Sequence, residues 1–126
     1  MVKKHYVSGY DQFLNAMKGF EPKEHVINIL FTGAKTNSNV SWCSDCVEAA
    51  PFIEQALEHA PENSHFIYCD VGDRSTWKDM QNPFRKDTST HLSVIPTLIR
   101  WKSPQRLEGE QCTKSDLLEM FFIDDN

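Results

Sequence analysis

Two cysteines at the spacing Cys-x-x-Cys, Cys43 and Cys46, are the residues of this sequence best placed to do chemistry. They stand in the stretch Trp42-Cys43-Ser44-Asp45-Cys46, where a polar loop meets an apolar run with helical periodicity. Two thiols at this spacing can close into one small disulfide ring or hold one metal ion. The choice between a redox pair and a metal site decides the function class that the sequence predicts.

The redox interpretation follows from the position of the pair at the start of a predicted helix. Free N–H groups of the first helical turn point at the sulfur of Cys43, and the helix dipole favours negative charge there. Both effects stabilise the thiolate, which is the nucleophilic form. Cys46, one turn further on, can attack a mixed disulfide formed by Cys43. The pattern therefore predicts an attacking and a resolving thiol, while the carboxylate of Asp45 between them opposes thiolate formation.

A metal site is the alternative interpretation of the same pair. A closed zinc site needs four ligands, usually arranged as two close pairs, whereas Cys69 and Cys112 stand alone in the sequence. The spacing of His59 and His65 does not match a ligand pair either. The strand–helix–strand context thus favours redox chemistry, and we expect no metal ligand. Cys69 and Cys112 are expected to be buried and unreactive.

Composition limits the class of protein further. The chain has 126 residues and 40% hydrophobic composition, which predicts a single domain over residues 1–126. Its 13 Lys and Arg against 18 Asp and Glu give a net charge of −5, and without a basic cluster we expect no nucleic-acid partner. The sequence shows neither a secretory signal nor an apolar stretch that would span a bilayer, so we expect a soluble, cytosolic protein without membrane partners.

Strands and helices are expected to alternate along the chain. The expected strands cover residues 2–7, 25–32, 65–71, 92–101 and 106–110, and the expected helices cover 10–18, 43–59 and 76–87, with a last helix capped by Thr113 or Ser115. Pro51 is expected to kink the second helix and Pro83 to interrupt the third. The predicted apolar face of the second helix comprises Val47, Ala50, Ile53, Ala56, Leu57 and Ala60. The order β α β α β α β β α predicts an α/β fold with a central mixed sheet flanked by helices.

These features together resemble the thioredoxin superfamily, and within it the Clot type of thioredoxin-like proteins, also known as the thioredoxin domain-containing protein 17 family. A tryptophan precedes the Cys-x-x-Cys, a proline follows the first cysteine by eight residues, and an Ile-Pro-Thr precedes the last hairpin. The resemblance spans nearly the whole chain. The residues that carry it are Phe31-Thr32-Gly33, Ser41-Trp42-Cys43, Asp45-Cys46, Phe66-Ile67-Tyr68-Cys69-Asp70-Val71-Gly72, Trp77-Lys78-Asp79, Phe84-Arg85-Lys86, Pro96-Thr97-Leu98 and Leu118-Glu119-Met120.

The resemblance implies a thioredoxin fold and a defined active site. The site residues it implies are the nucleophile Cys43, the resolving thiol Cys46, the substrate-groove residues Ile95 and Pro96, the latter as a cis proline, and the flanking residues Trp42, Ser44 and Asp45. It implies no bound cofactor: the redox group is the disulfide Cys43–Cys46, and NADPH supplies electrons through thioredoxin reductase. The implied activity is the reduction of small disulfides such as cystine, and of selected protein disulfides, by a cytosolic monomer whose partners are thioredoxin reductase and selected protein thiols.

Two residues depart from the patterns of these relatives. Ser44 stands where the Clot type has proline, which changes the backbone donors near the sulfur and leaves the reduction potential open. Leu30 stands where ordinary thioredoxins carry a buried aspartate, so the proton acceptor for the resolving thiol would be Asp45, Glu48 or water. The polar loop 33–40 is longer than in ordinary thioredoxins, and is either a device that narrows access or a neutral insertion.

Two other functions stay open at this point. A thioredoxin-fold adaptor would bind partner proteins through the Pro96 groove with little turnover, and its redox state would act as a switch. A metal-binding domain would use Cys43 and Cys46 as ligands. Replacement of Cys43 by serine abolishes turnover by a reductase but spares binding by an adaptor, and elemental analysis for zinc separates the metal-binding domain from both.

Overall fold

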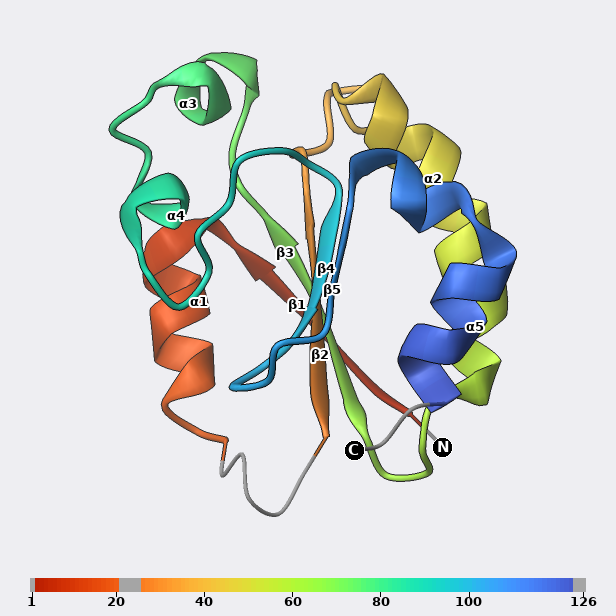
Figure 1. Cartoon of the computed structure of the whole chain (residues 1–126). Helices are drawn as coiled ribbons and strands as arrows, with labels where there is room; N and C mark the ends of the chain where they lie inside the picture. Colours follow the sequence, from red (N-terminus) through yellow and green to blue (C-terminus); the bar gives the residue numbers. More distant parts are fainter. Residues whose placement is uncertain (1, 21–25, 124–126) are drawn as a thin grey trace.

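A five-stranded mixed sheet with helices on both faces organises the computed structural model, which describes residues 2–20 and 26–123 (Figure 1). The strands are β1 (Lys3–Ser8), β2 (Ile27–Thr32), β3 (His65–Asp70), β4 (Thr97–Arg100) and β5 (Arg106–Glu108). The helices are α1 (Gly9–Met17), α2 (Ser44–Ala56), α3 (Arg74–Lys78), α4 (Pro83–Lys86) and α5 (Ser115–Ile123), with the 3₁₀ turns η1 (Leu57–His59) and η2 (Gly109–Thr113). The predicted fold class and order of elements are confirmed. No helix in this part of the chain is long and apolar enough to cross a bilayer.

The order of the strands places β2 at the centre of the sheet. The order is β1-β3-β2-β4-β5, in which β1 and β2 run parallel to β3, while β4 pairs antiparallel with β2 and β5. Parallel neighbours need crossover connections, and these contain α1 and α2. The strand predicted from residue 25 begins at Ile27, and His25 lies outside the described residues. The loop after β2 leads directly to α2, so the cysteine pair lies at the carboxyl edge of the central strand.

Side chains of β2 alternate between two hydrophobic clusters, one on each face of the sheet. Ile29 and Phe31 join the cluster that packs under α1, α3 and α4, whereas Leu30 joins the cluster under α2 and α5 (Figure 1). Asn28 is a polar residue within this buried strand, and its side-chain oxygen accepts a hydrogen bond from Arg100 Nε at 3.2 Å. This bond satisfies the side-chain oxygen of Asn28, while its Nδ2 is buried without a hydrogen-bond partner among the described residues.

The buried face of α2 differs from the predicted one: its buried residues are Cys46, Ala49, Ile53 and Ala56. The prediction was wrong for Val47 and Ala50, which are both exposed. These two side chains border a cavity between α2 and the sheet instead of packing against the strands. Pro51 lies inside the helix, as expected.

Two further differences from the predicted boundaries of helices and strands occur at prolines. One is at Pro83 and the other at Pro96. The third predicted helix is divided into α3 and α4, because the Asn82 side chain accepts a hydrogen bond from the Phe84 N–H and Pro83 takes the first position of α4. The strand predicted from residue 92 begins only at Thr97, immediately after Pro96. The segment before Thr97 is therefore a turn, and it approaches the cysteine pair.

Candidate active site

Cys43 occupies the N-cap position of α2 and turns its sulfur toward the free amides of the first turn. The N–H of Cys46 donates to Cys43 Sγ at 3.2 Å. An oxygen of Ser, Thr, Asp or Asn commonly fills this role, and here a thiol does so. The amide and the positive end of the helix dipole stabilise negative charge on the sulfur. Ser44 and Asp45 complete the first turn, and both are exposed.

Cys46 lies on the inner side of the same turn and is only 6% exposed. The pKa of its thiol is raised to about 12, mainly by burial and next by its hydrogen bond with Cys43, while the Thr32 hydroxyl and the Gly33 amide act in the opposite direction. Both thiols of the pair are free in the structure. Cys46 is therefore protonated at neutral pH and must lose its proton before it can act as a nucleophile.

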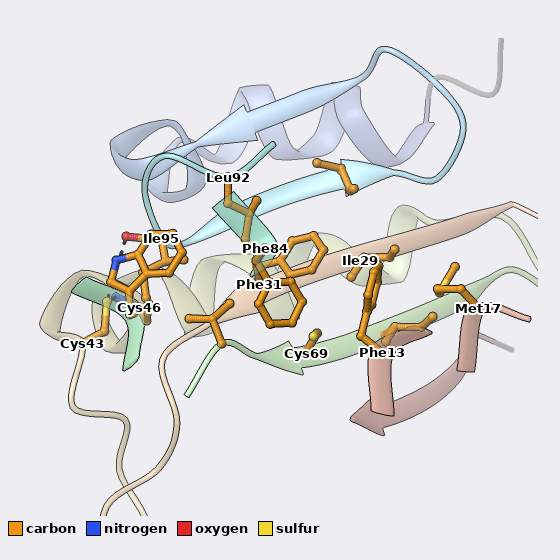
Figure 2. Packing of buried hydrophobic residues seen from close by; sticks show 14 of the residues in the cluster. Phe13, Met17, Ile29, Phe31, Cys43, Cys46, Cys69, Phe84, Leu92 and Ile95 are labelled. Atoms are coloured by element: carbon orange, nitrogen blue, oxygen red, sulfur yellow. Dashed lines mark hydrogen bonds between the residues drawn. The ribbon is translucent and has the colours of Figure 1, made fainter. Parts of the chain in front are cut away.

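The turn before β4 faces the thiol pair. Its Ile95–Pro96 peptide bond is cis, in agreement with the expectation from the resemblance. The Cys43 thiol lies 4.0 Å from the Ile95 carbonyl oxygen. The Gly109 N–H donates to the Pro96 carbonyl at 2.7 Å, which ties the turn to the end of β5. Figure 2 shows Ile95 beside the two cysteines, at one end of the buried cluster.

Trp42 borders the site next to Cys43. Its indole Nε1 donates to the Gly72 carbonyl at 2.8 Å, which fixes the ring against the end of the β3 segment. The Arg74 guanidinium lies 4.9 Å from the ring centroid, within the range of a cation–π contact. The site therefore carries one positive charge beside its aromatic wall, although the whole chain is acidic.

Close packing at Gly33 joins the end of β2 to the site. The Ser41 hydroxyl donates to the Gly33 carbonyl at 2.8 Å and accepts from the Cys43 N–H at 3.1 Å. A Cβ at Gly33 would lie 2.9 Å from Ser41 Oγ, 2.9 Å from the Trp42 ring and 3.0 Å from Cys43 Cβ. There is no room for a side chain at this position unless the site moves.

Gly33→Ala is therefore expected to displace Trp42 and Cys43, to lower the free energy of unfolding by about 1–3 kcal/mol, and to slow alkylation of Cys43. Thermal unfolding and the rate of iodoacetamide labelling measure the two effects. Gly19→Ala is the matched control, because within the described part of the chain a Cβ there would meet only the Ala16 carbonyl, at 3.5 Å. If the two variants had the same thermal stability and the same labelling rate, the close packing at Gly33 would not position Cys43.

Sequence reasoning missed two polar residues on the inner side of Cys46. Thr32 and Asp70 end β2 and β3 and line the cavity behind this thiol. A polar residue at the carboxyl end of a buried strand is the signal that could have indicated them. Asp45 and Glu48, the side chains expected to accept the proton of the resolving thiol, are exposed on α2 and do not line this cavity.

The remaining cysteines lie in the core. Cys69 and Cys112 are fully buried, as expected. Burial raises the pKa of the Cys69 thiol above its ordinary range and raises that of Cys112 to about 12. Thiols held in their protonated form are poor nucleophiles and metal ligands. Among the described residues, no group of three His, Cys, Asp or Glu side chains is placed to hold a metal ion.

The fold and the site together define a class of protein. A thiol pair begins the helix that follows the central strand, and a cis-proline turn before an antiparallel strand faces it. A sheet of this order with this site is a thioredoxin fold with a Cys-x-x-Cys pair. Thioredoxin O1 from Arabidopsis thaliana in its oxidized state has the same fold, with a TM-score of 0.60 and 21% identity over 95% of this chain and 98% of that one.

Comparison with known sequences places the chain more closely. The family described as thioredoxin domain-containing protein 17-like, thioredoxin domain, matches residues 6–124. Thioredoxin domain-containing protein 17 of Epinephelus coioides is 46% identical over 119 residues, and that of Homo sapiens is 40% identical over 119 residues; each match covers 94% of both chains. The thioredoxin-like protein Clot of Arabidopsis thaliana is 36% identical over 82% of this chain and 81% of its own. The chain belongs to the thioredoxin domain-containing protein 17 family, which confirms the resemblance.

Proposed function

We propose that this chain is a dithiol–disulfide oxidoreductase that reduces small-molecule disulfides and selected protein disulfides. The observation that carries the proposal is the position of Cys43 Sγ as the N-cap acceptor of α2, 3.2 Å from the Cys46 amide. This arrangement stabilises a thiolate next to a second, buried thiol. Membership of the family and the cis Ile95–Pro96 turn beside the pair support the same activity.

The reaction consists of two thiol–disulfide exchanges. The Cys43 thiolate attacks one sulfur of the substrate; a new S–S bond forms, the substrate S–S bond breaks, and the first substrate thiolate leaves. Cys46 then loses its proton and attacks the Cys43 sulfur, so that the Cys43–Cys46 disulfide forms and the second substrate thiolate leaves. Two electrons pass from the protein dithiol to the substrate, and the two released thiolates take up two protons.

The groups beside Cys43 suit small disulfides that carry a carboxylate. The Ile95 carbonyl lies 4.0 Å from the Cys43 thiol, so it can orient a substrate that approaches the sulfur. The Arg74 guanidinium, 4.9 Å from the centroid of the Trp42 ring, supplies a cation beside the residue that precedes Cys43. A carboxylate-bearing disulfide such as cystine can pair with this cation.

The oxidised pair has to be reduced again for a second turnover. In this proposal, thioredoxin reductase restores the Cys43–Cys46 dithiol with electrons from NADPH, and the chain holds no cofactor of its own because thiol–disulfide exchange needs none. The cytosol suits this role, since its reductases keep thiols reduced. The protein would act there as a monomer, without nucleic-acid or membrane partners.

A coupled assay with thioredoxin reductase, NADPH and cystine tests the proposal. NADPH consumption is expected to depend on the concentration of the chain and to stop when cystine is omitted. The rate of the reductase with cystine alone gives the background. The proposal fails if the wild-type chain, with both thiols reduced beforehand, does not raise NADPH consumption above this background.

A redox-regulated adaptor is the second candidate function, and the apolar side chains around the site favour it. Val40 and Val47 are exposed and line the cavity that Cys46 also lines, and the exposed Val94 precedes the Ile95–Pro96 turn. Exposed apolar groups that cluster at a site are typical of protein contacts. For an adaptor, Cys43→Ser would leave partner capture intact, so a pull-down that compares this variant with the wild type separates the two functions.

A further inference from the structure

A cavity lies behind Cys46, separate from the turn that faces Cys43. It has a volume of about 800 Å³ and opens to the surface. Residues of α2 and of the loop 33–41 form one wall, and β1, β2 and β3 form the other. Cys46 lines the cavity, whereas Cys43, Ile95 and Pro96 do not. The cavity therefore offers the buried thiol a second route to solvent.

Three polar residues lie in one row along the strand ends that line this cavity. Ser8, Asp70 and Thr32 are register partners at the ends of β1, β3 and β2. Their side chains lie on the α2 face of the sheet, because strand side chains alternate and Leu30 and Tyr68, two positions earlier, belong to the cluster under α2. Neighbouring strands are about 4.8 Å apart, so a water molecule can link adjacent members of the row.

Thr32 is the member of the row that contacts the thiol. Its hydroxyl and the Gly33 amide lie close enough to the Cys46 sulfur to act on the pKa of this thiol in the direction opposite to burial, which favours the thiolate form. A hydroxyl both donates and accepts, so it can take the thiol proton while it passes its own proton to a neighbouring water. Leu30, two residues earlier on the same face, is buried and provides no acceptor.

The second exchange needs a separate route because the Cys46 proton has to leave while the substrate is still attached. A substrate bonded to Cys43 would cover the side of the pair that faces the Ile95–Pro96 turn, and Cys46 is only 6% exposed. Polar cavities of sufficient size hold ordered water that bridges polar groups. The path that remains for the proton runs through the cavity.

We propose that Thr32 and Asp70 are positioning residues of the resolving step, and that they line a water-filled path along which the Cys46 proton reaches the Asp70 carboxylate and then solvent. The inference rests on the proposed function. Cys46 gives up its proton through Thr32 and water, and its thiolate attacks the Cys43 sulfur. The bond between Cys43 and the substrate sulfur breaks, and the departing thiolate is protonated from solvent. Only the dithiol is oxidised and only the substrate is reduced.

Asp70 is better placed for this role than Glu54, the other carboxylate that lines the cavity among the described residues. Glu54 lies two helical turns beyond Cys46, binds Lys4 Nζ at 3.1 Å and accepts a hydrogen bond from the Tyr68 hydroxyl. Asp70 lies at the end of β3, beside Thr32. Its carboxylate accepts a hydrogen bond from the Gly72 N–H at 3.1 Å. Besides Cys46 and Asp70, the titratable groups that line the cavity are Tyr6, Lys35, Glu54 and Tyr68. Glu54→Gln is therefore a matched control that removes one charge from the same cavity.

Single-turnover kinetics with the aromatic disulfide dithiobis(nitrobenzoate) separate the two exchanges. The first coloured thiolate is released at a rate proportional to the reagent concentration, and the second at a rate independent of it. Asp70→Asn and Thr32→Val are expected to slow the second release by about tenfold near neutral pH and to leave the first unchanged. Thr32→Ser, which keeps the hydroxyl, and Glu54→Gln are expected to match the wild type. The difference in the rate of second release between the two slow variants and the wild type is expected to shrink as pH rises, because hydroxide then takes the Cys46 proton.

Wild-type rates of second release in Asp70→Asn or in Thr32→Val would overturn the inference, and so would a deficit that is equal at every pH. If the wild-type chain releases no second thiolate, the proposed function itself fails, so the two failures are distinct. Circular dichroism establishes that each variant is folded. The Thr32→Val and Thr32→Ser pair keeps the test decisive even where Asp70→Asn does not fold, since Thr32→Val removes the hydroxyl and keeps the shape of the side chain, whereas Thr32→Ser removes the methyl group and keeps the hydroxyl.

Discussion

Cys43→Ser is expected to lower disulfide turnover by a factor on the order of a thousand or more, because an un-ionised hydroxyl is a weak nucleophile. The helix start would be retained: serine is a preferred N-cap residue, and its oxygen can accept the Cys46 N–H that now donates to Cys43 Sγ at 3.2 Å. The loss of turnover would therefore result from the missing thiol and not from unfolding of the chain. The coupled assay with cystine measures turnover, and thermal unfolding verifies that the variant is folded.

Cys46→Ser is the companion variant, and its expected result is different. Cys43 would still attack the substrate, but no thiol would resolve the intermediate, so a mixed disulfide accumulates. Mass spectrometry of the trapped adduct gives the mass of the attached substrate half. Undiminished turnover by Cys43→Ser, or no adduct on Cys46→Ser, would contradict the assigned order of the two thiols.

Phe84→Ala is expected to lower the free energy of unfolding by about 3–5 kcal/mol. Phe84 is 1% exposed, and its ring centroid lies 5.2 Å from that of Tyr10, 5.6 Å from that of Phe13 and 5.7 Å from that of Phe31. Figure 2 shows it next to Phe31 within this cluster. Because α4 spans only Pro83–Lys86, it depends on tertiary packing for its stability. Urea unfolding of the variant and the wild type measures the loss.

The loss of this ring is also expected to reach the active site. The Phe84 carbonyl accepts from the Leu92 N–H at 3.2 Å and from Thr90 Oγ1 at 2.8 Å, and this segment leads on to Ile95. Met80→Ala is the surface control, since Met80 is 70% exposed and its truncation is expected to change stability by no more than about 0.5 kcal/mol. A loss for Phe84→Ala no larger than that for Met80→Ala would show that α4 does not depend on this ring.

Local patterns were sufficient to predict the succession of strands and helices along the chain and the position of the Cys-x-x-Cys pair at the start of a helix. A Cys-x-x-Cys before an amphipathic run indicates a thiol at a helix start, since an N-cap bond joins residues within the same turn. The apolar run before the loop indicated the central strand, because strands covered on both faces lack polar alternation. The motifs together also identified the family, which the comparisons confirmed.

Local patterns failed where burial depends on what lies opposite an element. Val47 and Ala50 have the spacing of an apolar face, but α2 turns them toward a cavity instead of a packed strand. Periodicity shows which residues share a face and does not show what covers that face. The same limit applies to Pro96, since the cis and trans forms of an X–Pro bond differ by only about 0.5–1 kcal/mol and the surrounding structure selects one.

The sequence by itself determined that the Cys-x-x-Cys pair stands at the start of a helix, and in what succession strands and helices follow one another along the chain, because each depends on residues that are close together. Only the tertiary structure decided what surrounds the pair. The parallel register of β2 and β3 places Asp70 beside Thr32, and the packing of α2 over them brings Cys46 to the same cavity. The antiparallel pairing of β4 with β2 brings the Ile95 carbonyl to within 4.0 Å of the Cys43 thiol. These neighbours are far apart in sequence, and strand pairing and helix packing, which no short stretch encodes, bring them together.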